Sequence, residues 1–204
     1  MKPFNGVCPQ AGFSLIEMAV VLLVMGVLMG GVMKGMDMVE SAKYKKLVEL
    51  NDTLEGALLA YQDKYRRLPG DDSKVASFLG LTSEDAGSGN GSLSGDFDDT
   101  DEDVESRKLW QHLRAADLIN GAPTGDAARE IPQHAWSDSA GFESDRFGLS
   151  GLILCFKNLP GEWAQKLDVE RDDGNATTGR IQSGLTDTAQ IYARNVETHL
   201  CRKI

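Results

Sequence analysis

The chain has 204 residues, a formal net charge of -10 at pH 7 and hydrophobic residues at 41% of its positions. This length fits one globular domain of ordinary size plus a further segment, so no second catalytic domain is required. A surface with this excess of acid repels phosphate groups, which argues against direct binding to duplex DNA or to an anionic lipid surface, although a local basic patch is compatible with it.

Residues 1–12 differ from a conventional secretory signal, whose hydrophobic part precedes the cleavage site. They contain one basic residue, Lys2, two prolines and no apolar core. The apolar run follows instead: it extends from Phe13 to Met33, 21 residues with Glu17 as the single charge. At about 1.5 Å per residue the run is roughly 31 Å long, enough to cross a bilayer core. It predicts a membrane anchor over residues 13–36.

The charge at Glu17 requires an explanation, because an unpaired acid in a lipid-spanning helix costs about 2.5 to 3.5 kcal/mol. Either the carboxylate has a partner, or Glu17 lies close enough to the interface of an ordinary signal anchor to stay hydrated. The stretch Gly12-Phe13-Ser14-Leu15-Ile16-Glu17 resembles the class III leader junction of type IV pilins and type II secretion pseudopilins. It has the glycine, the aromatic residue and the glutamate four residues later, at the start of an apolar run.

This resemblance implies processing and assembly. A prepilin peptidase would cut between Gly12 and Phe13, remove residues 1–12 as the leader and methylate the new amino group of Phe13. In that family the acid corresponding to Glu17 pairs with the terminal amine of a neighbouring subunit as the filament forms. The implied partners are other pilin or pseudopilin subunits, the peptidase and the inner-membrane assembly platform. The implied location is the bacterial inner membrane, single-pass with a periplasmic head, and then a periplasmic or extracellular filament.

The cysteines agree with an exported head. Cleavage after Gly12 would remove Cys8 and leave Cys155 and Cys201, an even pair that suits a disulfide in an oxidising compartment such as the periplasm; two free buried thiols are the alternative. The positive-inside rule points the other way. Only Lys2 precedes the span, whereas four lysines follow it: Lys34, Lys43, Lys45 and Lys46. We give the junction motif and the cysteine pair more weight.

One long helix is predicted to continue from the anchor. Within the span, Gly26-xxx-Gly30 and Gly31-xxx-Gly35 have the spacing that lets transmembrane helices approach closely. Residues 37–68 are amphipathic, with apolar side chains at helical spacing: Leu47, Leu50, Leu54, Leu58, Tyr61 and Tyr65. The helix is expected to end near Arg67 and Leu68, because the residue before Pro69 is biased away from helix.

Residues 69–204 are predicted to form the periplasmic head, which contains a flexible acidic loop over residues 84–104. Asp99, Asp101 and Asp103 alternate like early calcium-loop ligands, but Val104 and Trp110 occupy the sixth and twelfth positions, so the loop does not match an EF-hand. Further predicted elements are a helix over 105–119, an irregular stretch over 122–146, a strand over 147–156, a helix from 159 to about 171, and closing strands at Ile181, 191–193 and 196–201. The fold class is α+β, a long helix packed on a small antiparallel sheet in the ladle-like form of pilins.

The turn at Asp172-Asp173-Gly174-Asn175 has two interpretations. Together with Leu159-Pro160-Gly161-Glu162 and a cysteine near each end, it resembles the heads of the prepilin-like family, some of which bind calcium. Asp172, Asp173 and Asn175 are therefore candidate calcium ligands, and an ordinary Asp-Gly turn without a metal is the alternative. No other cofactor is expected.

The sequence contains no recognisable catalytic motif. His112, His134 and His199 do not have the spacing of a zinc site, and no Gly-x-Ser-x-Gly nucleophile elbow occurs. We therefore predict a structural subunit of a type IV pilus, a type II secretion pseudopilus or a competence filament, and not an enzyme. The alternative is a minor, tip-located pilin whose head is a binding module for a surface, a secreted substrate or DNA.

Overall fold

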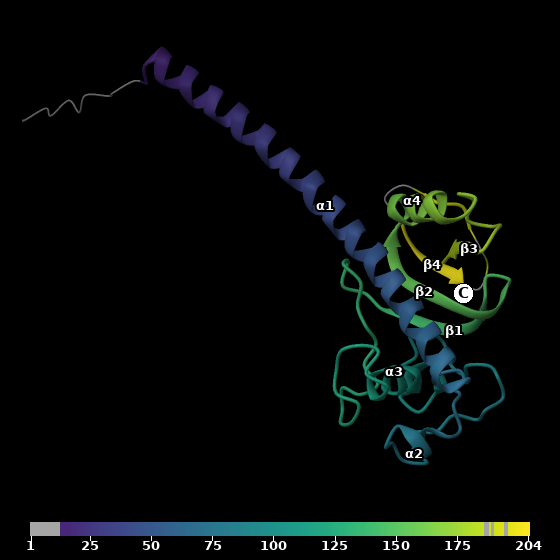
Figure 1. The fold of residues 1–204 in the computed structure, drawn as a ribbon. Helices are drawn as coiled ribbons and strands as arrows, with labels where there is room; N and C mark the ends of the chain where they lie inside the picture. The colour runs from purple at the N-terminus through teal and green to yellow at the C-terminus, as the bar shows by residue number, and fades with distance from the viewer. Residues whose placement is uncertain (1–12, 186–187, 189, 194–195) are drawn as a thin grey trace, which may run out of the picture. The chain divides into compact units, whose positions relative to one another are not determined.

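The computed structural model describes residues 13–185, 188, 190–193 and 196–204. These residues form two compact units that divide between Ala42 and Lys43. Helix α1 (Leu15–Tyr65) runs through both units, and all other described elements belong to the second unit (Figure 1).

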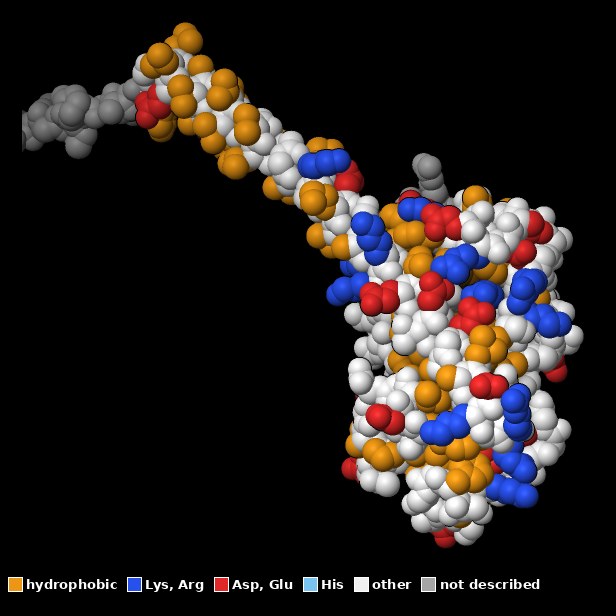
Figure 2. Space-filling view, viewed as in Figure 1, with side chains coloured by type: hydrophobic (Ala, Val, Ile, Leu, Met, Phe, Trp, Pro, Cys, Tyr) orange, Lys and Arg blue, Asp and Glu red, His pale blue; other side chains and the backbone are white. Residues whose placement is uncertain are grey.

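The first unit is the leading part of α1. Its helix is unbroken through the glycines from Gly26 to Gly35, where nothing lies within 4 Å of an added Cβ. All side chains from Phe13 to Met38 are exposed, and Figure 2 shows hydrophobic side chains over the visible face of this unit. The prediction of one long helix that continues beyond the apolar run is confirmed.

Helix α1 ends slightly before the predicted position. Its last residue is Tyr65, and Arg66 has φ of 54°, in the left-handed region that stops an α-helix. The Arg66 amide still donates to the Gln62 carbonyl at 2.8 Å, and Pro69 follows three residues later. The helix thus ends four residues before Pro69, because the chain leaves helical geometry at Arg66.

The second unit contains a four-stranded antiparallel sheet in the order β1-β2-β4-β3. The strands are β1 (Ala140–Arg146), β2 (Leu149–Pro160), β3 (Ile181–Gly184) and β4 (Glu197–Lys203). The predicted strand over 147–156 overlaps β2, which begins two residues later and extends four residues further. The expectation that residues 122–146 are irregular is wrong for β1, and no strand forms at 191–193.

The two faces of the sheet carry different cores because side chains alternate along each strand. On one face, Leu154, Phe156 and Leu200 join buried residues of α1 such as Leu54 and Leu58. On the opposite face a second cluster is formed by Phe97, Phe147, Leu149, Ile153, Cys155 and Cys201. The described α+β architecture, a long apolar helix with an antiparallel sheet, agrees with the predicted fold class.

The shorter helices lie beside this core. Helix α4 (Gly161–Arg171) begins two residues after the predicted start at 159, ends at Arg171 as predicted, and buries Ala164 and Leu167. Helix α3 (Glu105–Ala115) ends before the predicted Ile119, because Asp117 has φ of 58°. The four-residue helix α2 (Val75–Phe78) was not predicted.

Candidate functional site

The amino-terminal end of the described chain presents the predicted processing and assembly residues. Gly12, the proposed cleavage residue, lies outside the described residues, as does the rest of the leader. Phe13 is 79% exposed and precedes α1 by two residues. Glu17 lies in the first turn of α1, where the helix dipole favours a negative charge, and its side chain is exposed. Among the described residues of this single copy, no group forms an ion pair with Glu17.

The helix behind Glu17 is long and apolar enough to cross a membrane, by length and composition. None of its most apolar 18-residue window is buried within the chain. An apolar surface of this extent is stable only when lipid or other protein covers it. In the second unit, by contrast, α1 buries Tyr44, Leu47, Leu54, Leu58 and Tyr61.

The predicted cysteine pair is joined in the second unit. Cys155 of β2 and Cys201 of β4 are register partners, their sulfurs are 2.06 Å apart and both residues are fully buried. A sulfur held in a disulfide is not a free nucleophile. The carboxylate of Glu143 lies 3.5 Å from the Cys155 sulfur.

Glu143 is a buried acid with its own partners. Its carboxylate pairs with the Arg146 guanidinium at 3.1 Å and accepts the Phe97 amide at 3.0 Å. Burial raises the pKa of Glu143, although Arg146 and the Phe97 amide oppose this shift. The guanidinium also lies over the rings of Phe97 and Phe147. These contacts hold the loop that contains Phe97 against the face of the sheet that carries the disulfide.

The candidate calcium turn brings three carboxylates together. Oxygens of Asp168, Asp172 and Asp173 lie within 4.8 Å of one another. Asp168, at the end of α4, is fully buried and was not among the predicted ligands. Burial raises its pKa, and the charges of Asp173 and Asp172 add to that shift. Asn175, a predicted ligand, instead accepts hydrogen bonds from the amide and hydroxyl of Thr177.

Hydrogen bonds within the chain already hold these three carboxylates. Tyr192 donates its hydroxyl to Asp168 at 2.7 Å, the Ile181 amide donates to Asp172 at 2.8 Å and Thr178 donates to Asp173 at 2.6 Å. The arrangement offers oxygen ligands of the kind that Ca²⁺ prefers. The internal hydrogen bonds also account for the geometry of the turn, so calcium binding stays a prediction.

The comparison with protein families identifies a motif at the amino-terminal end of this chain. The prokaryotic N-terminal methylation motif matches residues 8–33, which include the Gly12–Phe13 junction, Glu17 and the apolar helix. This chain carries the type IV pilin and pseudopilin signature. Comparisons with curated proteins and with solved structures gave no match. The pilin motif and the long apolar helix fit a membrane-anchored protein whose head faces the periplasm, and the motif suggests a structural subunit.

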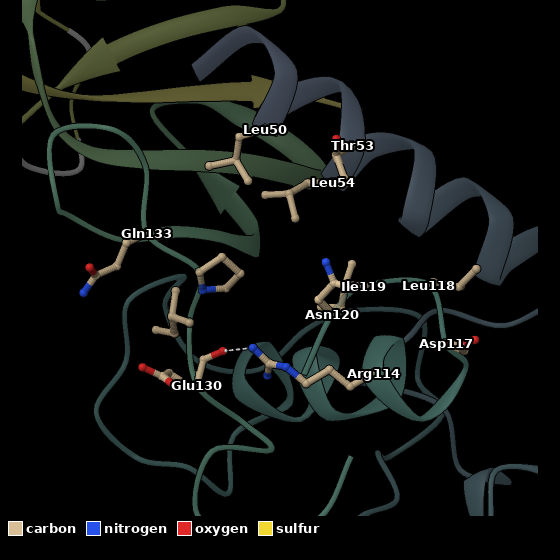
Figure 3. Close-up of a pocket in the computed structure, with 12 residues that line it drawn as sticks. Leu50, Thr53, Leu54, Arg114, Asp117, Leu118, Ile119, Asn120, Glu130 and Gln133 are labelled. Carbon is tan, nitrogen blue, oxygen red and sulfur yellow. Dashed lines mark hydrogen bonds between the residues drawn. The ribbon is translucent and has the colours of Figure 1, made fainter. Parts of the chain in front are cut away.

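The head of this pilin-like chain has an open groove beside α1. Its volume is about 530 Å³, and Figure 3 shows its lining side chains, which come from α1, the end of α3 and the loops at 117–120 and 130–133. Leu50, Leu54 and Ile131 supply apolar surface. The Arg114 side chain lies along one side of the groove, and its guanidinium donates a hydrogen bond to the Glu130 backbone carbonyl at 2.8 Å.

The three histidines serve the fold of the head. His112 accepts the Gly70 amide at Nδ1, at 2.8 Å, and lies 2.8 Å from the Asp85 carbonyl through Nε2. His134 makes the same type of bridge, to the Trp136 amide and the Lys157 carbonyl. His199 accepts the Asn158 amide. Each ring is thus held by backbone groups, which gives the histidines a structural role.

Sequence reasoning missed the acids that hold the loop over residues 84–104. Asp71 is 4% exposed and accepts the amides of Gly89, Asn90 and Gly91 at 2.6 to 2.9 Å. Glu105 likewise accepts two loop amides, from Ser88 and Ser94. The glycine-rich composition suggested a flexible loop. The signal in the sequence that could have identified the anchor of the loop is the pair Asp71-Asp72, which follows Pro69-Gly70. Both acids are buried in the structure.

Proposed function

We propose that this protein is a structural subunit of a type IV pilus or a type II secretion pseudopilus. A prepilin peptidase cleaves it between Gly12 and Phe13 and methylates the new amino group of Phe13. The processed subunit waits in the inner membrane with its head in the periplasm. The assembly platform then draws it into a helical filament with other pilin or pseudopilin subunits.

One observation carries this proposal: Glu17 has no ion-pair partner among the described residues, and it lies in the apolar part of α1, whose side chains from Phe13 to Met38 are exposed in the single chain. Both features require other molecules. Lipid or neighbouring helices remove the apolar surface from water, and the amine that cleavage creates on Phe13 of an adjacent copy supplies a cation for Glu17. Proteolysis therefore creates the docking group for the next subunit.

The first test is mass spectrometry of the mature amino terminus, which should begin at methylated Phe13. The second is Glu17→Ala, which should be inserted and cleaved normally but should fail to enter filaments. Glu49→Ala is the matched control, because Glu49 is an exposed acid on the same helix beyond the apolar run. A functioning filament built from chains that begin at Met1, or normal assembly of Glu17→Ala, would contradict the proposal.

Calcium binding by the head is a separate proposal, carried by the three carboxylates near the end of α4. Bound Ca²⁺ would relieve the repulsion among Asp168, Asp172 and Asp173. Calcium should then raise the melting temperature of the protein, and Asp172→Asn should remove this response while Asp126→Asn retains it. An equal melting temperature in calcium and in a chelator would refute calcium binding.

The groove beside α1 favours the alternative function, a minor tip-located subunit that binds a surface, a secreted substrate or DNA. Its apolar floor would suit a protein or peptide ligand better than a nucleic acid, because the mature chain has 31 acidic and 20 basic side chains. Electron microscopy with a head-specific antibody separates the two functions. Labelling along the fibre supports the structural subunit, and labelling confined to the tip supports the binding module.

A further inference from the structure

The turn between α4 and β3 contains a motif whose chemistry differs from that of the carboxylates beside it. Residues 173–177 have the sequence Asp-Gly-Asn-Ala-Thr, so Asn175 is followed two positions later by a threonine. An asparagine with serine or threonine two residues later, and no proline between them, is the acceptor sequence for N-linked glycosylation. Such sites lie on surface loops of exported proteins. The motif makes Asn175 a candidate acceptor.

The Asn175 side chain is open to a modifying enzyme. Asn175 and Thr177 are exposed, whereas Ala176 between them is buried. The Thr177 hydroxyl and backbone amide both donate to Asn175 Oδ1, at 3.0 and 3.2 Å. Among the residues that the structure describes, none accepts a hydrogen bond from Asn175 Nδ2. The nitrogen that would receive a sugar is therefore unengaged, and the hydroxyl that the motif requires lies next to the same amide group.

The motif occurs a second time in α1, at Asn51-Asp52-Thr53, where it is closed to an enzyme. Asn51 is 1% exposed, and its Nδ2 donates to Asp52 at 3.1 Å. A transferase must take the asparagine into its own active site. A buried residue of a continuous helix cannot enter such a site unless the core unfolds, so Asn51 serves the fold.

The third occurrence, Asn90-Gly91-Ser92, is exposed but has a fixed backbone. The amides of Asn90 and Gly91 donate to the buried carboxylate of Asp71, at 2.9 and 2.7 Å. Such charge-assisted hydrogen bonds are stronger than neutral ones. Asp71 precedes this motif in the chain, so its acceptor oxygens are present as soon as the loop is made. The Asn90 motif therefore provides a matched comparison for Asn175.

The turn at Asn175 is attached to the sheet late. Within the turn, Asp173 accepts the Asn175 amide at 2.9 Å. The link to the sheet is the Ala176 carbonyl, which accepts the Ser183 amide of β3 at 2.9 Å. Among the described strands, β3 pairs only with β4, which is the last described element of the chain. The turn therefore stays unattached until β4 has joined the sheet, and during that interval an enzyme can reach the motif.

We propose that Asn175 is an N-glycosylation site of the exported head. The co-reactant is an oligosaccharide linked to a polyprenyl pyrophosphate, and the enzyme is an oligosaccharyltransferase. Asn175 Nδ2 attacks C1 of the first sugar, so an N–C bond forms and the C1–O bond to the pyrophosphate breaks. Polyprenyl pyrophosphate leaves, and one amide proton passes to a base of the enzyme. This inference rests on the proposed export of the head and is independent of filament assembly.

A glycan at this position leaves the neighbouring groups in place. Transfer uses Nδ2, so Oδ1 can keep its hydrogen bonds from Thr177. The carboxylates of Asp168, Asp172 and Asp173 take no part, and glycosylation is therefore compatible with calcium binding. A glycan is bulky and hydrated. The surface that carries the α4–β3 turn then faces solvent in a filament and does not pack against the next subunit.

The test is peptide mass spectrometry of the full chain purified from the cells that naturally make it. We expect the peptide that contains Asn175 to carry an oligosaccharide. Asn175→Gln and Thr177→Ala should each remove this added mass, and Thr177→Ser should retain it, because serine also fits the motif. The matched control is Asn90→Gln, which removes an exposed motif whose backbone Asp71 holds and should leave the added mass unchanged.

The cysteines of the same samples report export independently, through thiol labelling under denaturing conditions. An unmodified Asn175 in a protein whose Cys155–Cys201 disulfide has formed overturns glycosylation and leaves export standing. An unmodified Asn175 with both cysteines reduced overturns export and the glycosylation that rests on it. An added mass that Asn175→Gln retains, or that Asn90→Gln removes, also overturns the assignment. Loss of the mass in Asn175→Gln and Thr177→Ala, with retention in Thr177→Ser and Asn90→Gln, supports it.

Discussion

Asp71 and Glu105 show how buried acids can organise a glycine-rich loop. Their carboxylates accept amides from Ser88, Gly89 and their neighbours, which places backbone donors around each negative charge. Such charge-assisted hydrogen bonds are shorter and stronger than neutral ones. The donors belong to small residues, so the backbone can close around the acid. The order of this loop therefore depends on residues outside it.

Asp71→Ala should destabilise the head, because three loop amides and the Ser88 hydroxyl lose their acceptor. We expect the free energy of unfolding to fall by about 3 kcal/mol, measured by urea denaturation. Asp101→Ala is the control, because Asp101 is an exposed acid in the same loop, and its cost should stay below about 0.5 kcal/mol. Equal effects of the two substitutions would contradict the assigned role of Asp71.

The histidines make the stability of the head depend on pH. Burial lowers the pKa of His112, His134 and His199, although the hydrogen bonds of His112 and His134 to backbone carbonyls oppose this shift. A histidine with a lowered folded-state pKa contributes stability that is fully present above the unfolded pKa, about 6.5. That contribution is lost as the pH falls toward the folded pKa, because the unfolded chain binds more protons.

The head should therefore be less stable at pH 5.5 than at pH 7.5. His112→Asn should weaken this dependence, because an amide oxygen can accept the Gly70 amide but does not titrate. The raised pKa values of Glu143 and Asp168 act in the opposite direction, and they are common to both proteins. Urea midpoints at the two pH values, compared between wild type and variant, isolate His112. Parallel pH profiles would show that His112 does not contribute.

At the scale of elements, the two helices with clear local signals were predicted well. The position of Pro69 predicted the end of α1 to within a few residues, and the position of Pro160 predicted the start of α4 equally closely. Proline acts through its own ring and the residue before it, so its effect can be predicted from the sequence. The amino-terminal methylation motif could likewise be recognised from the sequence, because its signature is contiguous.

Elements that depend on distant partners were not predicted. Strand β1 carries Glu143, an acid that looks exposed in sequence but is buried beside Arg146 and the Phe97 amide. Residues 191–193 look like a strand, yet Tyr192 is fixed outside the sheet by its hydrogen bond to Asp168. The contacts of Trp163 with Tyr44 and Trp136 were missed for the same reason, since the three rings come from separate segments. Local propensity carries no information about such pairings.

Removal of the disulfide should weaken the sheet without changing its register. The bond closes a loop with a sequence separation of 46, for which the loop-entropy model gives about 4 kcal/mol. We expect Cys155→Ala/Cys201→Ala to lower the free energy of unfolding by about this amount. Reductant should destabilise the wild type and leave the variant unchanged. A variant as stable as the oxidised wild type would contradict this expectation.

At the scale of the whole molecule, an apolar helix and a disulfide-bonded head place opposite demands on their surroundings. The helix needs lipid or neighbouring subunits, and the disulfide needs an oxidising compartment. Protease added to cells whose outer membrane has been opened should therefore degrade the head while a cytoplasmic marker survives. Protection of the head until the inner membrane is lysed would reverse the proposed orientation.

The strand order of the sheet has a consequence for biogenesis. Strand β4 is the last of the described elements in the chain, yet it lies between β2 and β3 and carries Cys201. While residues 197–203 are still inside a ribosome or a translocation channel, the inner edges of β2 and β3 have no partner. Until β4 has emerged, the head is thus an open template for unwanted strand pairing.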